Sequence, residues 1–394
     1  MTNRQRMLTW IACGSVLTGP VSAEFNLGDV KISGFGSVVG GQTLDSNETL
    51  YGYDNDFSMH PESRFALQFI APISEKFKAT AQIMARGKDD YTPSFEWAFI
   101  TYKATDDLSF MAGRQRFQLF KYSDYVEVGY AYLWIRPPRG VYDIQFNSGD
   151  GVGVHYRTHF GEVDTNFTYK IISIDIPDFV PQGTNLTPGH YEINNANLFN
   201  ADLTWDYLNF GINLIYIPKL SYDSPLIAPV ADAVRQFGYS ESTVQDILAR
   251  EDPVKVYGAY IGYDPGDWFV LAEYTSVQLD PSAFADQDSY YLSAGFRWDK
   301  LTFHTTYGAD ENTASSNADQ VIRPSDVLPG GLPLKTAVSQ AVNAQVSESD
   351  YYSFGVRWDV ETQVAIKLEF TNFNDKKFDA KDAKLISTSI DFVF

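Results

Sequence analysis

The chain has 394 residues, with 30 Lys or Arg against 50 Asp or Glu, and a formal net charge of −20 at pH 7. So acidic a chain lacks the basic surface that phosphate backbones require, which argues against nucleic acid as a partner. Phe, Tyr and Trp number 28, 25 and 7, yet no run of about 18 apolar residues follows the first segment, which excludes a membrane-spanning helix.

That first segment, of 23 residues, has the pattern of a secretory signal peptide. Arg4 and Arg6 precede an apolar stretch, and residues 21–23 are small, which suits cleavage after them. Cys13 leaves a lipoprotein signal open as the alternative. The expected mature chain, residues 24–394, loses two arginines and the only cysteine, so its net charge is −22 and it has no disulfide.

Segments with alternating apolar and polar residues recur from residue 30 to the end. Their length of about ten residues is what a tilted transmembrane strand needs. The sixteen predicted strands are 30–40, 62–71, 75–86, 95–102, 108–116, 151–159, 163–171, 197–205, 208–217, 256–263, 268–277, 290–298, 301–308, 351–358, 364–371 and 385–394. We therefore expect an all-β fold, a closed antiparallel transmembrane barrel with both chain ends on one side.

The connections alternate between short and long, as in bacterial barrels with short periplasmic turns and long outer loops. The long segments 172–195, 218–255 and 309–350 are polar. In an outer membrane they would lie among lipopolysaccharide phosphates, and their carboxylates could hold Ca²⁺, although no EF-hand spacing is present. The acids concerned are Glu241, Asp246, Glu251, Asp252, Asp310, Glu311, Asp319 and Asp326.

Large aromatic residues precede four of the short turns. They occur as Trp205-Asp206, Tyr263-Asp264, Trp298-Asp299 and Trp358-Asp359. Trp-Asp pairs also mark propeller blades, but those recur at a regular spacing of about 40 residues, which is not seen here. The pattern instead predicts an aromatic girdle at the periplasmic interface.

The terminal segment LISTSIDFVF puts Ile386, Ile390, Phe392 and Phe394 on one face and Asp391 on the other. It resembles the C-terminal signature of Gram-negative outer-membrane proteins. The resemblance implies that Phe392 and Phe394 form the signal read by the outer-membrane assembly machinery.

The long connection 117–149 lies between the fifth and sixth predicted strands. General porins place there a loop that folds into the barrel and narrows the pore, and Gly113-Arg114-Gln115 is similar to the strand end before it. The family's Pro-Glu-Phe-Gly-Gly loop motif is absent. The resemblance implies a homotrimeric 16-stranded porin of the outer membrane. Segment 141–147 also alternates, so eighteen strands are the alternative, but Pro137-Pro138 favours a loop.

Charged residues in this loop and on the inferred lumen faces are the candidate pore residues. The loop candidates are Lys121, Asp124, Glu127, Arg136, Arg139 and Asp143, and the wall candidates are Arg64, Lys78, Arg86, Arg114, Arg116, Arg157, Arg297 and Arg357. Loop acids facing wall bases would create a transverse field across the opening. Arg114 has the parity of Phe110, so it points inward only if a bulge or strand end intervenes.

The expected function is passive diffusion of small hydrophilic solutes or ions. A substrate-specific channel for sugars or anions is the alternative, with the loop tyrosines Tyr122, Tyr125, Tyr130 and Tyr132 as a stacking track. A surface adhesin or receptor is a third interpretation. Five histidines could act as bases, but the chain has neither a Gly-x-Ser-x-Gly nor a His-Glu-x-x-His motif, so we expect no enzyme, catalytic residue or metal site.

Overall fold

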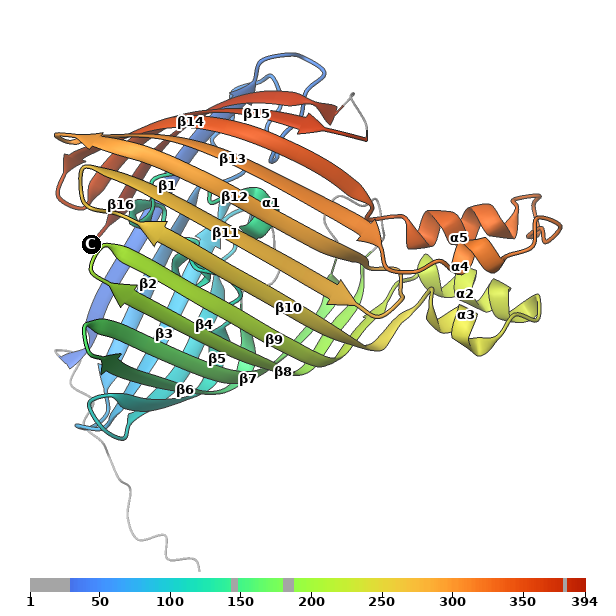
Figure 1. Cartoon of the computed structure of the whole chain (residues 1–394), viewed down its shortest axis with the longest axis horizontal. Helices are drawn as coiled ribbons and strands as arrows, with labels where there is room; N and C mark the ends of the chain where they lie inside the picture. The colour runs from blue at the N-terminus through green and yellow to red at the C-terminus, as the bar shows by residue number, and fades with distance from the viewer. Residues whose placement is uncertain (1–28, 143–147, 180–187, 378–380) are drawn as a thin grey trace, which may run out of the picture.

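The computed structural model describes residues 29–142, 148–179, 188–377 and 381–394. Within these ranges the chain forms one closed barrel of sixteen antiparallel strands, each paired with its neighbours in sequence, and the first strand pairs with the last (Figure 1). The predicted signal peptide lies outside the described residues. The strands are β1 (Lys31–Thr43), β2 (Arg64–Pro72), β3 (Phe77–Arg86), β4 (Ser94–Lys103), β5 (Leu108–Arg116), β6 (Ser148–Phe160), β7 (Val163–Phe179), β8 (Gly189–Trp205), β9 (Leu208–Asp223), β10 (Ala249–Tyr263), β11 (Trp268–Leu279), β12 (Ala285–Trp298), β13 (Leu301–Ala314), β14 (Ser347–Glu361), β15 (Val364–Asp375) and β16 (Ala383–Val393).

The predicted fold class is confirmed, and each predicted strand corresponds to one strand of the barrel. The predicted long connections include residues that belong to strands in the structure. β7 continues to Phe179, β8 begins at Gly189, and β10 begins at Ala249, so Glu251 and Asp252 lie in a strand. The prediction stopped these three strands at bilayer length, whereas their backbone pairing continues beyond it.

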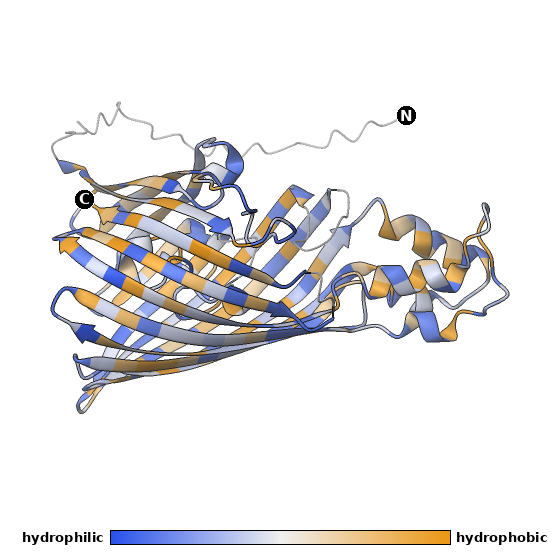
Figure 2. Cartoon of the chain, turned by 90° about the horizontal axis from the view of Figure 1, so that it is seen from above, coloured by the Kyte–Doolittle hydropathy of each residue, from blue (hydrophilic) through white to orange (hydrophobic). Residues whose placement is uncertain are grey.

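Hydrophobic and hydrophilic residues alternate along many of the strands (Figure 2), and successive side chains of a strand point to opposite faces of the barrel wall. On β16, Ile386 and Ile390 are exposed on the outside, whereas Ser387 and Asp391 are buried inside. Trp298 and Trp358 are exposed beside short turns, where the aromatic girdle was predicted. Such an apolar outer face, with every strand paired, suits a bilayer.

The long connections after β9 and β13 carry short helices, which the sequence reading took as plain loops. These are α2 (Ile227–Gln236), α3 (Glu241–Gln245), α4 (Ala318–Val321) and α5 (Leu334–Val342). α2 packs on α3 and α5, and α4 packs on α5. Together they form a helical projection beyond the strand ends opposite the C-terminus (Figure 1). None of the helices in the described part of the chain is long and apolar enough to span a membrane.

Candidate functional site

The connection between β5 and β6 enters the barrel. We call its described part, residues 117–142, the internal loop; it contains η3 (Ser123–Tyr125), η4 (Gly129–Ala131) and α1 (Arg139–Tyr142). β5 pairs directly with β6 and the barrel closes with sixteen strands, so no strand of this connection is inserted between them.

Backbone oxygens of the internal loop accept hydrogen bonds from the far wall of the barrel. Lys367 Nζ on β15 donates to the carbonyls of Gly129 and Trp134, each at 2.6 Å. Arg357 on β14 donates to the carbonyls of Tyr130 and Tyr132 at 2.7 and 2.9 Å. The loop therefore crosses the lumen from β5 to β14 and β15.

Glu127 fixes the middle of the loop to the near wall. Arg86 Nη2 lies 2.9 Å from Glu127 Oε1, and Arg64 Nε donates to the Glu127 carbonyl oxygen at 2.7 Å. Arg86 also pairs with Glu96 at 2.6 Å. Arg64 and Arg86 were predicted to face the lumen, and they do.

Arg136 fixes the next part of the loop through two carboxylates. Its guanidinium lies 2.6 Å from Glu62 and 3.2 Å from Glu369, and it donates to Ser387 Oγ at 2.8 Å. Arg139 approaches Glu62 at 3.4 Å. Burial alone would raise the pKa of the Glu62 carboxyl, but the charges of Arg136 and Arg139, with a smaller effect of Arg64, outweigh burial and lower it to about 2.

This arrangement differs from the expected transverse field. Glu127 contacts its arginines directly, and the basic Arg136 contacts wall acids, so these charges pair across a closed contact and not across an opening. Asp124 is half-buried and makes no ion pair within the described residues. Asp143 lies outside the described residues.

The remaining predicted wall residues are spread along the barrel. Lys78 and Arg157 are exposed on inward positions near short turns, and Arg297 pairs with the turn residue Asp264 at 2.7 Å. Arg116 turns inward at the end of β5, where it is buried beside Glu96 at 3.7 Å.

Arg114 is a correction, because it lies outside the pore. It pairs with Asp150 at 3.0 Å, on the same outer face as Val152. The pairing of β5 with β6 runs from Leu108 to Arg116 without a bulge, so the side chain of Arg114 points outward like that of Phe110.

Sequence reasoning missed four buried acids and a lysine that hold the loop. Lys367 and Asp391 form a pair at 3.1 Å, each with a side chain 1% exposed. Glu273 on β11 accepts hydrogen bonds from the Lys121 backbone and from Tyr142 and Tyr291. Glu62 and Glu369 complete the set. Strand parity was the available signal for Lys367, Glu273 and Glu369, because all three lie on inward positions.

The other side of the loop is apolar and packs on an apolar stretch of the lumen wall. Phe117, Phe120 and Trp134 join a cluster with Leu198 and Ile215 of β8 and β9. Trp134 is 1% exposed, and its indole nitrogen donates to Thr306 at 2.8 Å. Lys121 lies between the Tyr260 ring, 4.0 Å away, and Asn209 Oδ1, 2.9 Å away.

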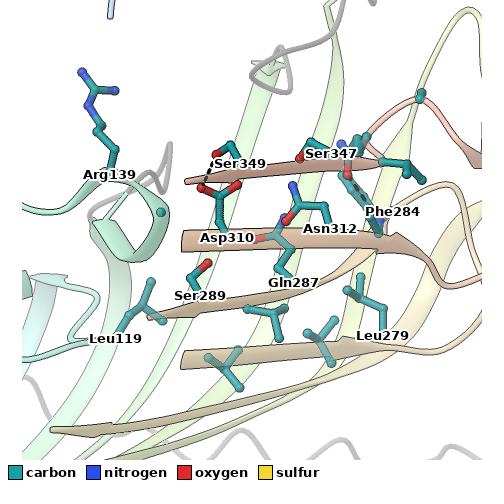
Figure 3. A pocket seen from close by; sticks show the side chains of 18 of the residues that line it. Leu119, Arg139, Leu279, Phe284, Gln287, Ser289, Asp310, Asn312, Ser347 and Ser349 are labelled. Carbon is teal, nitrogen blue, oxygen red and sulfur yellow. Dashed lines mark hydrogen bonds between the residues drawn. The ribbon is translucent and has the colours of Figure 1, made fainter. Parts of the chain in front are cut away.

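Two cavities lie on opposite sides of the internal loop. The loop-end vestibule, of about 650 Å³, is lined by Leu119 and Arg139 of the loop and by strand ends near the long connections (Figure 3). The turn-end vestibule, of about 480 Å³, is lined by Lys121 and Tyr125 of the loop and by Asp264 and other residues near the short turns. The loop thus partitions the lumen.

The acids of the long connections were considered above as possible Ca²⁺ ligands. Among the described residues, no group of three or more His, Cys, Asp or Glu side chains is placed to hold a metal ion. Asp326, one of the acids considered for Ca²⁺, instead pairs with Arg323 at 3.0 Å and accepts a hydrogen bond from Tyr239. Ca²⁺ binding stays a prediction.

No protein-family profile matches the sequence, and no curated protein sequence matches it. Solved structures do match. The anion-selective porin from Comamonas acidovorans has a TM-score of 0.56 at 11% identity, covering 93% of this chain and 99% of the porin. OmpF of Salmonella typhi in complex with daunomycin has a TM-score of 0.57 at 11% identity, covering 93% of this chain and 97% of OmpF. The trimer form of OmpT, an outer-membrane protein of Vibrio cholerae, has a TM-score of 0.54 at 11% identity, covering 93% of this chain and 99% of OmpT. The chain therefore has the fold of the outer-membrane porins.

Proposed function

We propose that the protein is an outer-membrane channel through which small hydrophilic solutes diffuse down their gradients. The observation that carries the proposal is the pair of vestibules, of about 650 and 480 Å³, inside a closed barrel whose outer face is apolar. A loop anchored between them supplies the constriction. The proposal includes no catalytic step.

The proposed setting is the outer membrane of a Gram-negative bacterium, in contact with lipid and lipopolysaccharide. The proposed assembly is a homotrimer, supported by the porin fold and by the trimer form of the similar OmpT structure. Ca²⁺ bridging between the acidic outer loops and lipopolysaccharide belongs to the same proposal.

Single-channel recording in a planar bilayer tests the channel and the trimer together. Folded protein should give stepwise openings, grouped in threes. A salt gradient across the bilayer then gives the ion selectivity from the sign of the reversal potential. Correctly folded protein without any conductance would contradict the channel and favour the adhesin or receptor alternative.

A matched pair of variants tests the internal loop as the constriction. Glu127→Gln removes the charge that holds the loop to Arg64 and Arg86, whereas Asp124→Asn removes an equal charge three residues away that has no ion pair in the described structure. Glu127→Gln should raise the conductance or the frequency of gating, and Asp124→Asn should leave both near the parent values. Equal effects of the two variants would contradict this role of the anchor.

A substrate-specific channel is the second candidate, because aromatic rings of the loop border a vestibule. Tyr122, Tyr125 and Tyr132 line the turn-end vestibule, while Tyr130 stacks under Arg357 with the guanidinium carbon 4.8 Å from the ring centre. Tyr122 and Tyr125 are partly exposed and could stack on a solute there, whereas Tyr132 is 4% exposed and its hydroxyl accepts a hydrogen bond from Arg64 and donates one to the Val126 carbonyl.

A further inference from the structure

The wall of the loop-end vestibule changes its chemistry between β11 and β12. One continuous row of paired residues crosses five strands there: Val256 on β10 opposes Val277 on β11, Val277 opposes Gln287 on β12, and the row ends in Asn312 and Ser347. All five line the cavity. A single row of the barrel wall is therefore apolar on one side and polar on the other.

The apolar side extends over several neighbouring strands. Ile217, Val254 and Leu279 form a second paired row across β9, β10 and β11, and Phe179 and Phe284 add aromatic rings. Ile217, Val254 and Val256 are only 2–5% exposed and belong to the buried cluster behind this wall, whereas Val277, Leu279, Phe179 and Phe284 are partly exposed. Contact of these four side chains with water is unfavourable by roughly 25 cal/mol per Å² of apolar surface. An occupant with an apolar part would cover it.

The polar side carries hydrogen-bonding groups without a dominant charge. Ser289 on β12, Asp310 on β13 and Ser349 on β14 form a paired row next to Gln287, Asn312 and Ser347. Figure 3 shows these side chains projecting from adjacent strands above Leu279. Ser349 donates to Asp310 at 2.7 Å. Hydroxyl, amide and carboxylate oxygens of this kind accept hydrogen bonds from hydroxyl groups of a ligand.

We propose that the loop-end vestibule binds amphipathic hydroxylated solutes, with an aromatic or short aliphatic body on β9–β11 and sugar-like hydroxyl groups on β12–β14. This proposal rests on the proposed channel function and names the substrate class of the same lumen. The cavity of about 650 Å³ is within the range of pockets that enclose small organic ligands, roughly 300–1,000 Å³. The apolar wall distinguishes this class from plain sugars, and the polar wall distinguishes it from hydrocarbons.

Two probes that share one polar part test the proposal. Methyl β-glucoside and phenyl β-glucoside differ only in the apolar group, so their difference in binding reports the apolar wall. Each is added on the loop-end side of single channels in a planar bilayer, and the half-blocking concentration is measured. Phenyl β-glucoside should block at a concentration at least about tenfold lower.

Variants at the boundary of the two walls assign the preference to this vestibule. Val277→Ser should lower the preference for the phenyl compound about threefold, and Gln287→Leu, which extends the apolar row by one strand, should raise it by a similar factor. Thr302→Ala, in the turn-end vestibule, should not change it. Gln287 is exposed in the cavity, so its substitution tests the proposal even if Val277→Ser fails to fold.

The outcomes separate this proposal from the channel itself. Conductance with equal block by the two glucosides, or a preference that the Val277 and Gln287 variants leave unchanged, would overturn the substrate class and keep the channel. Absence of conductance in folded protein would overturn the channel, and equilibrium binding of the two glucosides to the detergent-solubilised barrel would then still decide whether the vestibule prefers the phenyl compound.

Discussion

Lys367 is an ammonium group held between the barrel wall and the internal loop. Its Nζ donates to two loop carbonyls at 2.6 Å and lies 3.1 Å from Asp391, with the side chain 1% exposed. Removing one partner of a buried ion pair leaves the other charge uncompensated, at a cost of about 3–5 kcal/mol. We therefore expect Lys367→Met to lower the free energy of unfolding by that amount, measured by urea titration of the barrel in detergent.

The double variant Lys367→Met with Asp391→Asn is the control, because it removes both charges. It should recover part of the lost stability but not the fixed position of the loop, so its channel current should be noisier than that of the parent. Equal stability of the single and double variants would show that the uncompensated carboxylate is not the cause.

Glu62 makes the stability of the loop anchor depend on pH. Its pKa is lowered from the ordinary value of 4.5 to about 2 because Arg136, Arg139 and Arg64 outweigh the effect of burial. A carboxyl whose pKa is lower in the folded state stabilises that state fully above the unfolded value of 4.5, and the stabilisation is lost as pH falls toward 2.

The unfolding temperature should therefore change little through this group between pH 7 and pH 5 and fall between pH 4.5 and pH 2. In Glu62→Gln, the unfolding temperature should be lower at pH 7 and should fall less steeply on acidification. Parallel pH curves for the parent and the variant would contradict the role of Glu62.

Individual charged residues show how far sequence reasoning reaches. Parity correctly placed Arg64, Arg86 and Arg357 inside the barrel, and the same parity made Arg114 doubtful as a wall residue, which the structure then placed outside. Parity gives the face of a strand but not the height along the pore, so the contacts of Glu127 with its arginines could not be foreseen. Lys367 carried the same signal and was overlooked.

At the scale of elements, the strands were predictable and the helices were not. Alternation identifies each strand locally, whereas α2 and α5 depend on each other: Val234 of α2 and Leu334 and Val338 of α5 are buried in one cluster. Their apolar residues are spaced within segments that are polar on average, so composition alone indicated loops.

This mutual packing predicts unequal effects of deletions in the helical projection. Replacing residues 225–247 by a short linker removes α2 and α3 and exposes the apolar face of α5, so this protein should aggregate after extraction. Deleting residues 316–342 as well removes that face, and the double deletion should stay monodisperse in size-exclusion chromatography. Aggregation of both, or of neither, would show that the helices do not protect one another.

At the scale of the whole molecule, the barrel depends on one closing seam between β1 and β16. Gly34 and Phe394 exchange two backbone hydrogen bonds of 2.9 Å, and the Phe394 ring lies over Gly34, where a side chain at position 34 would overlap it. Phe394 also stacks on Phe65 of β2, with ring centres 6.0 Å apart. The sequence predicted the terminal phenylalanine as an assembly signal, but not the glycine on which its ring lies.

These contacts predict that Phe394 stabilises the closed barrel through both its backbone hydrogen bonds and its ring. Deleting Phe394 removes two closing hydrogen bonds and the ring, so the fraction of barrel that stays folded in unheated detergent should fall severalfold. Phe394→Ala keeps the backbone hydrogen bonds, so the folded fraction should fall less than in the deletion. Gly34→Val should lower the folded fraction as much as the deletion does, because the valine side chain displaces the Phe394 ring. Phe394→Tyr should assemble normally. If assembly in cells falls while refolding in detergent does not, the terminal residue acts on the assembly machinery and not on closure.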